Sequence, residues 1–325
     1  MQTQVKIHIL IEFKSGPWGG GNQFLKGLRE KLIEKEVYSD RPENSNVAIF
    51  NSHHNIKNVI KYKIKYPDKL LIHRVDGPMS YRGDKGKKLD RKIFQINSKI
   101  SDGTVFQSNW SKEENIINGM EVGSKSIVIN NAPDPKIFFP SKQKNNKKIK
   151  LISTSWSNNL DKGFDIYHFI DQNLDFDRYD MSFIGRTDKS FENISFIDPL
   201  PSKILADKIR DHDIFIFASK IEACSNSLLE AIHCGLPAVA RNTSSNPEVL
   251  RGNGEIFNDE KDVIEKINLV SSKLNDYKKN LNYETMDTIA DKYIDYCKSF
   301  LSSKTYNKKP PIGLIDRIKL GRTLI

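Results

Sequence analysis

Two glutamates in the second half of the chain frame a run of small polar residues. In EACSNSLLEAIHCGLPAV, which covers residues 222–239, Glu222 and Glu230 lie eight positions apart. In one continuous helix they would be about 12 Å apart along the axis and could not share a site. Asn226 and Ser227, however, are of the types that begin helices, and Ser227-Leu-Leu-Glu230 matches the capping-box pattern. We therefore expect a helix from Asn226 or Ser227, with Glu222 in the preceding loop and Glu230 in the first turn.

This arrangement has two interpretations. In the first, the N–H groups of the first turn bind an anion such as a diphosphate, and the carboxylates accept hydrogen bonds from neighbouring hydroxyl groups. In the second, Glu230 only completes the capping box, which contributes about 1 kcal/mol to stability. The two interpretations compete for the side chain of Glu230, and the sequence leaves the choice open.

Two further segments have the composition of an anion site. Gly19, Gly20 and Gly21 follow the first predicted strand and open a helical pattern, and glycine lets the backbone approach a ligand closely. Their spacing fits neither the dinucleotide fingerprint nor a P-loop, so a flexible turn is the alternative. Lys162 precedes Gly163 at the start of another predicted helix, where a cation opposes the helix dipole unless a phosphate also binds there.

His73 and Asp76 stand at the end of a strand pattern, in HRVDGP. In open α/β sheets, ligands bind beyond the carboxyl ends of the strands. An imidazole or a carboxylate at this position could face a reacting carbon. The alternatives are a histidine satisfied within the core and an Asp-Gly-Pro turn, and the sequence does not choose between them.

The elements that must position these residues alternate along the chain. Strands are expected at 5–11, 46–50, 69–75, 103–108, 126–131, 148–155, 179–185, 194–198, 213–219 and 236–241. Helical spacing between them, as at 22–35 and 55–66, predicts βαβ units and parallel sheets. The proline-containing segment 131–148 is typical of a linker between two such series.

We therefore predict an α/β protein with two doubly wound, Rossmann-like parallel-sheet domains facing a central cleft. The expected ranges are an N-terminal domain at 1–135, a C-terminal domain at 136–301 and a basic tail at 302–325. A length of 325 residues agrees with two domains, because single cores stop growing at roughly 250 to 300 residues.

Composition narrows the function classes. A net charge of +10 favours anionic partners, although much of it lies in polar runs such as KQKNNKKIK that are typical of solvated surface. The three cysteines include no CxxC pair, which indicates neither a disulfide framework nor a zinc site and favours a reducing cytoplasm. No apolar run reaches the ~20 residues that span a bilayer, so membrane contact is expected to be peripheral.

The segment 213–250 resembles the donor-binding segment of glycosyltransferase family 4, whose members are retaining enzymes of the GT-B fold. The resemblance rests on Glu222 and Glu230 with seven residues between them, on CGLPAVA at 234–240 and on NPE at 246–248. The glycine cluster, NAPDPKIFFP and the step from Lys162 to Phe164 fall in the order that this family uses. The family's Arg about six positions before the lysine is absent, since Trp156 and Ser157 stand there, and Arg186 is a candidate replacement.

The resemblance implies that a sugar moves from a nucleoside diphosphate sugar to an acceptor hydroxyl with retention of configuration. It places Lys162 and the glycine loop at the diphosphate, Glu222 beside the donor sugar and Glu230 at the ribose. Together with the first-domain candidates, the expected catalytic residues are Glu222, Asp76, His73 and Lys162. The expected donor-binding residues are Gly19, Gly20, Gly21, Arg186, Asn226, Ser227, Leu228 and Glu230.

The resemblance also implies the partners. It predicts a nucleoside diphosphate sugar as co-substrate, with no cofactor and no metal, and a glycan or lipid-linked acceptor in polysaccharide or glycoconjugate assembly. No nucleic acid partner is expected. The protein is expected to be cytoplasmic, and its basic tail permits peripheral contact with an anionic membrane.

Two rival interpretations stay open. A metal-dependent transferase of the GT-A type would use a D-x-D pair, and the chain has Asp175-Phe-Asp177 and Asp211-His-Asp213. Both pairs precede a predicted strand, whereas a metal pair should follow one, so we expect these aspartates at the surface. The other rival is a non-catalytic module that binds a nucleotide, nucleic acid or an acidic membrane through its positive charge.

Overall fold

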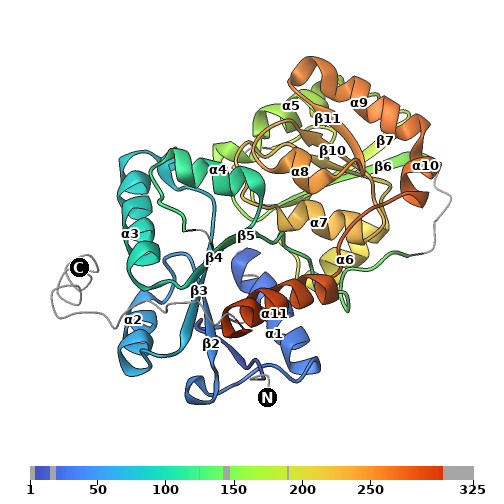
Figure 1. The fold of residues 1–325 in the computed structure, drawn as a ribbon. Coiled ribbons are helices and arrows are strands. Elements are labelled where there is room, and N and C mark those ends of the chain that lie inside the picture. Colours follow the sequence, from blue (N-terminus) through green and yellow to red (C-terminus); the bar gives the residue numbers. More distant parts are fainter. Residues whose placement is uncertain (1–3, 15–19, 124, 142–146, 189, 303–325) are drawn as a thin grey trace. The chain divides into compact units, whose positions relative to one another are not determined.

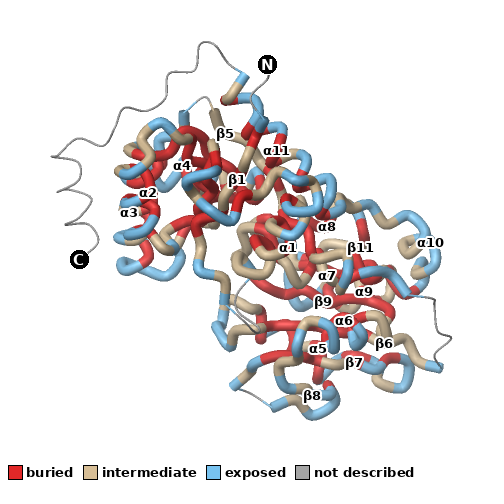
Figure 2. The backbone as a smooth tube through the Cα atoms, turned by 90° about the horizontal axis from the view of Figure 1, so that it is seen from below, coloured by how far each residue is buried: buried red, intermediate tan, exposed pale blue. Residues whose placement is uncertain are grey.

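The chain forms two compact units, each with its own parallel sheet (Figure 1). The computed structural model describes residues 4–14, 20–123, 125–141, 147–188 and 190–302. Unit 1 takes its described residues from 1–14, 25–130 and 287–325, and unit 2 takes them from 15–24 and 131–286. Residues 47–51, 70–75, 103–106 and 214–217 are buried along their whole length (Figure 2).

Unit 1 contains a five-stranded sheet in the order β1-β2-β3-β4-β5. Its strands are β1 (Ile7–Ile9), β2 (Val47–Asn51), β3 (Leu70–Val75), β4 (Gly103–Phe106) and β5 (Ser126–Val128). Tyr38 forms a parallel bridge to Ile7, and β2 pairs with the same strand at Val47. Tyr38 therefore lies on one side of β1 and β2 on the other. The chain crosses from the first side to the second between Tyr38 and β2, which makes this position a topological switch point.

Helices cover both faces of this sheet. They are α1 (Gly20–Glu34), α2 (Ile56–Lys65), α3 (Asp84–Ile100), α4 (Asn109–Ile117) and α11 (Met286–Ser302), with short 3-10 turns η1 (Pro42–Asn44) and η2 (Ser80–Arg82). Leu71 packs in one core cluster with residues of α2 and α3. The next residue, Ile72, points to the opposite face, where a Cβ built at Gly103 would touch both Ile72 and Phe300 of α11. Helix α11 therefore completes the core of unit 1.

Unit 2 contains a six-stranded sheet in the order β11-β10-β9-β6-β7-β8. Its strands are β6 (Ile149–Ser155), β7 (Tyr179–Gly185), β8 (Ser195–Ile197), β9 (Ile214–Phe217), β10 (Ala238–Arg241) and β11 (Gly254–Phe257). From β6 the chain adds β7 and β8 on one side and then crosses to add β9, β10 and β11 on the other. The switch point of this sheet lies between β6 and β9.

The helices of unit 2 are divided between the two faces by the alternation of the strand residues. They are η3 (Leu160–Lys162), α5 (Phe164–Asn173), α6 (Ser202–Arg210), α7 (Asn226–His233), α8 (Asn246–Leu250), α9 (Glu260–Ser272) and α10 (Leu274–Lys279). Ile214 and Ile216 of β9 pack in one cluster with residues of α5 and α9. Phe215 and Phe217 pack in the other cluster, with residues of α6, α7 and α8. Period-2 alternation in a buried strand thus fills two cores at once.

Several elements differ from the sequence prediction. The prediction names no helix at α3 or α4 and no strand at β11. The segment expected as a linker buries Phe138 in the core of unit 2. The predicted C-terminal domain extends to residue 301, whereas α11 from Asp287 on belongs to unit 1 by its contacts. Its apolar residues find their partners far back in the chain, and no local pattern records that choice.

The two D-x-D pairs also differ in their surroundings. Asp175 and Asp177 are exposed, as expected. Asp213 is buried, which corrects the expectation of a surface residue. Its carboxylate accepts a hydrogen bond from the Lys150 backbone N–H at 3.0 Å and forms an ion pair with Lys278 at 2.9 Å. Asp213 precedes β9, so it lies at the amino end of the strand, away from the edge where ligands bind.

Candidate functional site

The switch point of the unit 2 sheet brings together two of the predicted catalytic residues. Lys162 follows β6 and Glu222 follows β9, and these two neighbouring, parallel strands flank the switch point. Lys162 Nζ donates to Glu222 Oε1 at 2.5 Å. Both side chains are partly exposed, at 28% and 18%. A cation and a carboxylate 60 residues apart therefore meet where open α/β sheets bind their ligands.

Gly163 explains why Lys162 can reach this position. Its backbone has φ +80°, and a Cβ at this residue would lie 2.1 Å from the carbonyl oxygen of Ala218, directly after β9. Only glycine combines this left-handed conformation with so close an approach. The same contact region is fastened by the Lys220 N–H, which donates to the Asp161 carbonyl at 2.7 Å.

The loop that carries Glu222 is fixed by side-chain hydrogen bonds. Ser219 Oγ donates to Glu222 Oε1 at 2.7 Å, and the Glu222 N–H donates to Ser244 Oγ at 3.0 Å. Asn246 Nδ2 donates to the Ser219 carbonyl at 2.8 Å. The loops after β9 and β10 therefore form one hydrogen-bonded unit, which holds the Glu222 carboxylate in place before any ligand arrives.

The start of α7 corrects the capping box that the sequence suggests. The helix begins at Asn226, as expected, but its N-cap is Ser225, whose Oγ accepts from the Leu228 N–H. Ser227 lies within the first turn, and its hydroxyl bonds to that of Ser225 at 3.1 Å. Glu230 is consequently the fifth residue of the helix and lies in its second turn. The N-cap lies two residues before Ser227, because Ser225 has the extended backbone that a capping residue needs, whereas Ser227 is already helical.

Glu230 has no hydrogen-bond or ion-pair partner among the described residues. Its side chain does not return to its own backbone, which excludes the capping interpretation. Desolvation by burial raises the pKa of its carboxyl to about 8. A half-buried carboxyl without a protein partner is costly, and a ligand that offers hydroxyl groups would remove that cost.

Asn226 is tied to two neighbouring segments of unit 2. Its Oδ1 accepts from Asn131 Nδ2 at 2.8 Å, and its Nδ2 donates to the Gly20 carbonyl at 2.8 Å. Gly20 and Gly21 form the first residues of α1, and a Cβ at Gly20 would lie 2.8 Å from Asn226 Nδ2. The glycine segment and the N-terminus of α7 are therefore neighbours, as the donor-loop prediction requires. Gly19 lies outside the described residues.

Arg186 follows β7 at the same edge of the sheet. Its backbone N–H donates to the Ser155 carbonyl at 2.9 Å, and its side chain is exposed. Gly185 permits this approach, since a Cβ there would lie 1.8 Å from the Ser155 carbonyl oxygen. Arg186 thus stands beyond the end of the strand next to β6. Whether it replaces the missing arginine of the family pattern stays a prediction.

In unit 1, His73 has no exposed surface. It is 0% exposed and stacks on Phe50, with ring centroids 4.1 Å apart. One ring nitrogen bonds to the Ser52 carbonyl at 3.1 Å, and the other is 3.0 Å from Asn97 Nδ2. Burial lowers the pKa of the imidazole to about 3. A neutral ring with both nitrogens satisfied by protein groups cannot contact a substrate unless the core rearranges, so the core alternative fits this residue.

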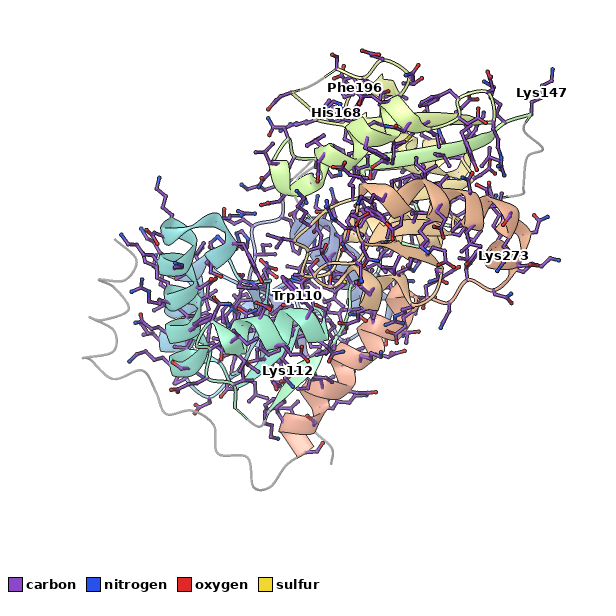
Figure 3. The ribbon with its side chains drawn as sticks, turned by 90° about the horizontal axis from the view of Figure 1, so that it is seen from above. Trp110, Lys112, Lys147, His168, Phe196 and Lys273 are labelled. Carbon is purple, nitrogen blue, oxygen red and sulfur yellow. The ribbon has the colours of Figure 1, made fainter. Side chains whose placement is uncertain are left out.

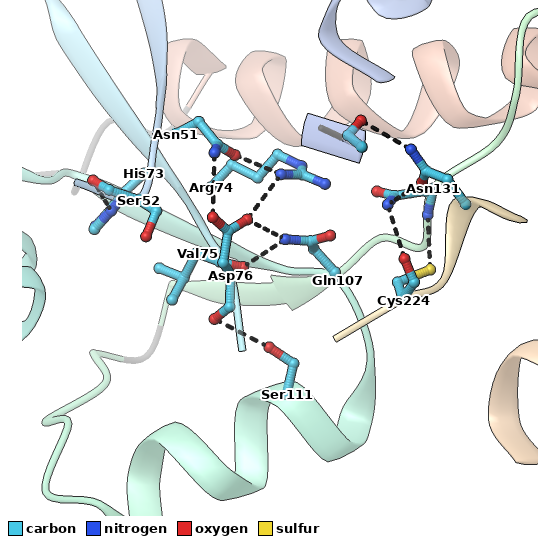
Figure 4. Close-up of polar contacts among 12 residues, drawn as sticks. Asn51, Ser52, His73, Arg74, Val75, Asp76, Gln107, Ser111, Asn131 and Cys224 are labelled. Carbon is cyan, nitrogen blue, oxygen red and sulfur yellow. Dashed lines mark hydrogen bonds and ion pairs between the residues drawn. The ribbon is translucent and has the colours of Figure 1, made fainter. Parts of the chain in front are cut away.

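Asp76 has the opposite setting, at the edge of a polar cluster beyond β3 (Figure 4). Its Oδ1 accepts from Gln107 Nε2 at 2.6 Å and from Arg74 Nη1 at 3.3 Å. Its Oδ2 accepts from Asn51 Nδ2 at 3.4 Å. The Asp76 side chain is 21% exposed, whereas that of Arg74 is 0% exposed. Of the two first-domain candidates, the structure exposes Asp76.

Sequence reasoning missed the residues that surround Asp76. Asn51 is the last residue of β2, Arg74 is the penultimate residue of β3 and Gln107 directly follows β4. Polar residues near three neighbouring strand ends are the signal that could have identified them. An aromatic pair was missed too: Tyr81 of η2 stacks on Trp110 of α4, with ring centroids 6.0 Å apart. Figure 3 labels Trp110. The predicted elements did not include α4, so the pair had no place in the prediction.

The described residues contain neither a metal-binding cluster nor a membrane-spanning helix. No group of three or more His, Cys, Asp or Glu side chains in the described part of the chain is arranged to hold a metal ion. Within the same residues, no helix has the length and apolarity to cross a membrane.

Comparison with solved structures identifies the architecture. Sucrose-phosphate synthase from Thermosynechococcus elongatus superposes with a TM-score of 0.63 at 10% identity, covering 99% of each chain. Anabaena Alr3699/HepE in complex with UDP gives 0.65 at 12% identity, covering 98% of this chain and 99% of that one. The lipopolysaccharide outer core galactosyltransferase WaaB, in its apo form, gives 0.62 at 13% identity and covers 91% and 99%. The fold is GT-B.

Sequence comparison adds a narrower match within this GT-B chain. Residues 177–273 match the family described as glycosyl transferases group 1. This range includes Arg186, Glu222 and Glu230 but neither Lys162 nor Asp76. A curated relative, "Uncharacterized protein 356" of Sulfolobus islandicus rod-shaped virus 1, is 25% identical over 177 residues, 47% of this chain. The chain spans about half the length of that relative, at 48%.

The GT-B architecture also decides one of the rival interpretations. A metal-dependent transferase of the GT-A type would need a different fold from the two parallel-sheet units seen here. The D-x-D pairs are accordingly not the metal pair of such an enzyme.

Proposed function

We propose that this protein is a glycosyltransferase that moves a sugar from a nucleoside diphosphate sugar to an acceptor hydroxyl. The observation that carries the proposal is the meeting of Lys162 with Glu222 at the switch point of unit 2, beside the N-terminus of α7. Similarity to the group 1 glycosyl transferases over residues 177–273 supports it. The structure of Anabaena Alr3699/HepE with UDP makes UDP-sugars the first donors to test.

Each group in unit 2 has a role in this reaction. Departure of the diphosphate creates negative charge, which Lys162 and the N–H groups at the start of α7 stabilise. Binding of the diphosphate replaces the ion pair of Lys162 with Glu222 and leaves the carboxylate beside the donor sugar. Lys162 therefore serves as the electrostatic catalyst, and Glu222 orients the sugar or stabilises positive charge on its reacting carbon.

Glu230 would bind the ribose hydroxyls of the donor. A carboxyl group with a pKa near 8 is mostly protonated at pH 7, so it can both donate and accept a hydrogen bond. The vicinal hydroxyls of a ribose offer both kinds of partner. Arg186, exposed after β7, is the proposed second cation of the donor site.

The finer properties of the proposed enzyme follow the family 4 resemblance. We propose retention of configuration by front-face attack, without a metal, and an acceptor that is a glycan or a lipid-linked glycan. The setting would be polysaccharide or glycoconjugate assembly, with the protein in the cytoplasm or at the membrane surface. Activity that survives EDTA and an α-linked product from an α-linked donor are the corresponding expectations.

The central test measures binding and turnover of nucleotides. Calorimetry should detect UDP or another nucleoside diphosphate, and Lys162→Ala should weaken its binding about 10- to 100-fold, because a charge-assisted contact to phosphate is lost. Lys266→Ala is the matched control, since Lys266 is similarly exposed and paired with Glu265 on α9. Glu222→Ala should remove sugar transfer from a folded protein.

Three outcomes would count against the proposal. Absence of binding by every nucleoside diphosphate and every nucleotide sugar would contradict the donor site. Equal losses for Lys162→Ala and Lys266→Ala would contradict the place of the diphosphate. Nucleotide binding without any release of the sugar would favour the non-catalytic binding module over the enzyme.

A further inference from the structure

The polar cluster of unit 1 consists of Asn51, Arg74, Asp76 and Gln107. Within it, the fully buried Arg74 lies against the partly exposed carboxylate of Asp76. Arg74 Nη1 contacts Asp76 Oδ1 at 3.3 Å and also donates to Asn51 Oδ1. Gln107 Nε2 donates to the same Asp76 oxygen at 2.6 Å and to the Val75 carbonyl at 3.2 Å. Three strand ends thus supply donors to a single carboxylate (Figure 4).

The backbone of Asp76 is held as firmly as its side chain. Asn115 Nδ2 donates to the Asp76 carbonyl at 3.0 Å, and Ser111 Oγ donates to the same oxygen at 3.4 Å. Both donors belong to α4, whose N-cap Ser108 accepts from the Ser111 N–H. The residue therefore has little freedom to turn.

The two carboxylate oxygens of Asp76 are not equally occupied. A carboxylate oxygen can accept about two hydrogen bonds. Oδ1 accepts two, from Arg74 and Gln107. Oδ2 accepts one long bond, at 3.4 Å, from Asn51. Its remaining capacity, on a side chain that is 21% exposed, suits a hydroxyl donor from outside the protein.

The burial of Arg74 needs a reason other than stability. Removing a guanidinium from water costs several kcal/mol, and an apolar side chain of similar volume often serves a core as well. A buried cation at the carboxyl end of β3, directly against Asp76, does what an apolar residue cannot. It supplies both a positive charge and a fixed direction to the carboxylate.

We propose that Arg74 is a positioning residue, which holds the Asp76 carboxylate with Oδ2 turned to accept a hydrogen bond from a substrate hydroxyl. Gln107 assists it by occupying the second acceptor site of Oδ1. This inference rests on the proposed glycosyltransferase function and names the chemistry of its contact in unit 1: a sugar hydroxyl, bound by an anionic acceptor. Arg74 itself touches no substrate.

A double-mutant cycle on UDP release from a UDP-sugar tests this proposal. At saturating donor, Asp76→Asn should lower kcat about 100-fold and Arg74→Met about 10-fold, because each removes part of one preorganised acceptor. The double variant should be no slower than Asp76→Asn alone, since Arg74 acts only through Asp76. UDP affinity should stay within about twofold in all three, because UDP binding is assigned to unit 2, and Arg74→Lys should restore part of kcat.

The matched control is Lys63→Met. Lys63 forms the other buried ion pair of unit 1, with Asp102 at 3.2 Å, at the amino ends of β3 and β4. It should lower stability and leave kcat unchanged. If Arg74→Met does not fold, Gln107→Leu takes its place in the same cycle, with the same non-additive expectation.

The results separate this inference from the proposed function. The positioning role would be overturned if the losses of kcat multiplied in the double variant. It would also be overturned if kcat were unchanged in folded Arg74→Met and Gln107→Leu. In both cases turnover by the wild type would still support the proposed enzyme. A wild-type protein that releases no UDP from any UDP-sugar or other nucleotide sugar would overturn the proposed function, and this inference with it.

Discussion

Glu222 and Glu230 belong to one short segment but lie in different electrostatic surroundings. Glu222 accepts hydrogen bonds from Lys162 and Ser219, in a loop fixed by Ser244. Glu230 lies in the second turn of α7 and has no side-chain partner among the described residues. Burial raises the pKa of its carboxyl to about 8. The first glutamate is therefore stabilised by protein groups, whereas the second has no such group among the described residues.

Glu230 should make stability depend on pH. Its pKa in the folded protein is raised above the ordinary value of 4.5, so its contribution is fully present below about pH 4.5 and is lost as pH rises through about 8. Glu230→Gln, which cannot ionise, should exceed the wild type in unfolding free energy at pH 8.5 by on the order of 2 to 3 kcal/mol, after allowance for partial exposure.

Urea unfolding at pH 4.5 and pH 8.5 measures this difference. The advantage of Glu230→Gln should shrink to a few tenths of a kcal/mol at the lower pH. The exposed Glu113→Gln is the control and should follow the wild type at both. A Glu230→Gln curve parallel to that of the wild type across this range would show that the carboxyl is solvated and has no need of a ligand.

At the scale of single elements, glycines decide where the loops after the strands lie. Gly163 and Gly185 each allow one strand end to approach the backbone of its neighbour closely, at Ala218 and Ser155. These contacts bring Lys162, which precedes Gly163, and Arg186, which follows Gly185, to the same edge of the sheet. The candidate site of unit 2 thus depends on backbone packing as much as on its charged side chains.

Gly163→Ala should separate Lys162 from Glu222. The variant incurs the cost of a left-handed backbone, about 1 to 2 kcal/mol, and also places a Cβ 2.1 Å from the Ala218 carbonyl oxygen. Gly119→Ala is the matched control, because Gly119 has φ +97° but nothing within 4 Å of its added Cβ. We expect Gly163→Ala to lower the unfolding free energy at least twice as much as Gly119→Ala does. We also expect Gly163→Ala to weaken UDP binding by the same factor as Lys162→Ala.

Thermal unfolding and calorimetry of both variants provide the comparison. Equal destabilisation by the two substitutions would mean that the loop moves away from Ala218 at no cost. Full UDP affinity in Gly163→Ala would mean that the position of Lys162 does not depend on this contact.

At the scale of the whole molecule, the chain does not divide into two successive halves. It leaves unit 1 after Asn130 and returns to it at Asp287. Helix α11 buries Ile289, Tyr293, Cys297 and Phe300, and Tyr296 Oη donates to the Lys125 carbonyl at 2.8 Å. Unit 1 is therefore complete only after the rest of the chain has been made.

A chain that ends at Thr285 should lose the stability of unit 1. Burial of one large apolar side chain contributes about 1.5 to 3 kcal/mol, so the loss of Ile289, Tyr293 and Phe300 alone removes a large part of the 5 to 15 kcal/mol, roughly, that holds a domain together. Hydrogen exchange should show β3 and β4 exposed in the shortened chain. The strands β6 and β9 of unit 2 serve as the internal control and should stay protected.

Protected β3 and β4 in the shortened chain would mean that unit 1 folds without α11. Loss of protection in both units would mean that α11 stabilises the molecule as a whole rather than the unit it contacts.

The sequence by itself determined the features that depend on a few neighbouring residues. Alternating β-branched runs predicted the parallel strands of both units except β11, and the composition of residues 224–227 placed the start of α7 at Asn226 or Ser227, with Glu222 outside it. These signals are local because strand periodicity and helix capping are set within one or two turns of backbone. The two-domain α/β architecture was predictable for the same reason, since it follows from the order of such elements, whereas the GT-B fold was expected from the family resemblance.

Only the tertiary structure decided which side chains meet. Lys162 and Glu222 are 60 residues apart, and their contact depends on the order of strands in the sheet, which periodicity does not record. The burial of His73 and the return of α11 to a strand 192 residues earlier depend likewise on packing. Local patterns specify how a segment is shaped, whereas burial and strand order, which are properties of the folded chain, specify what it touches.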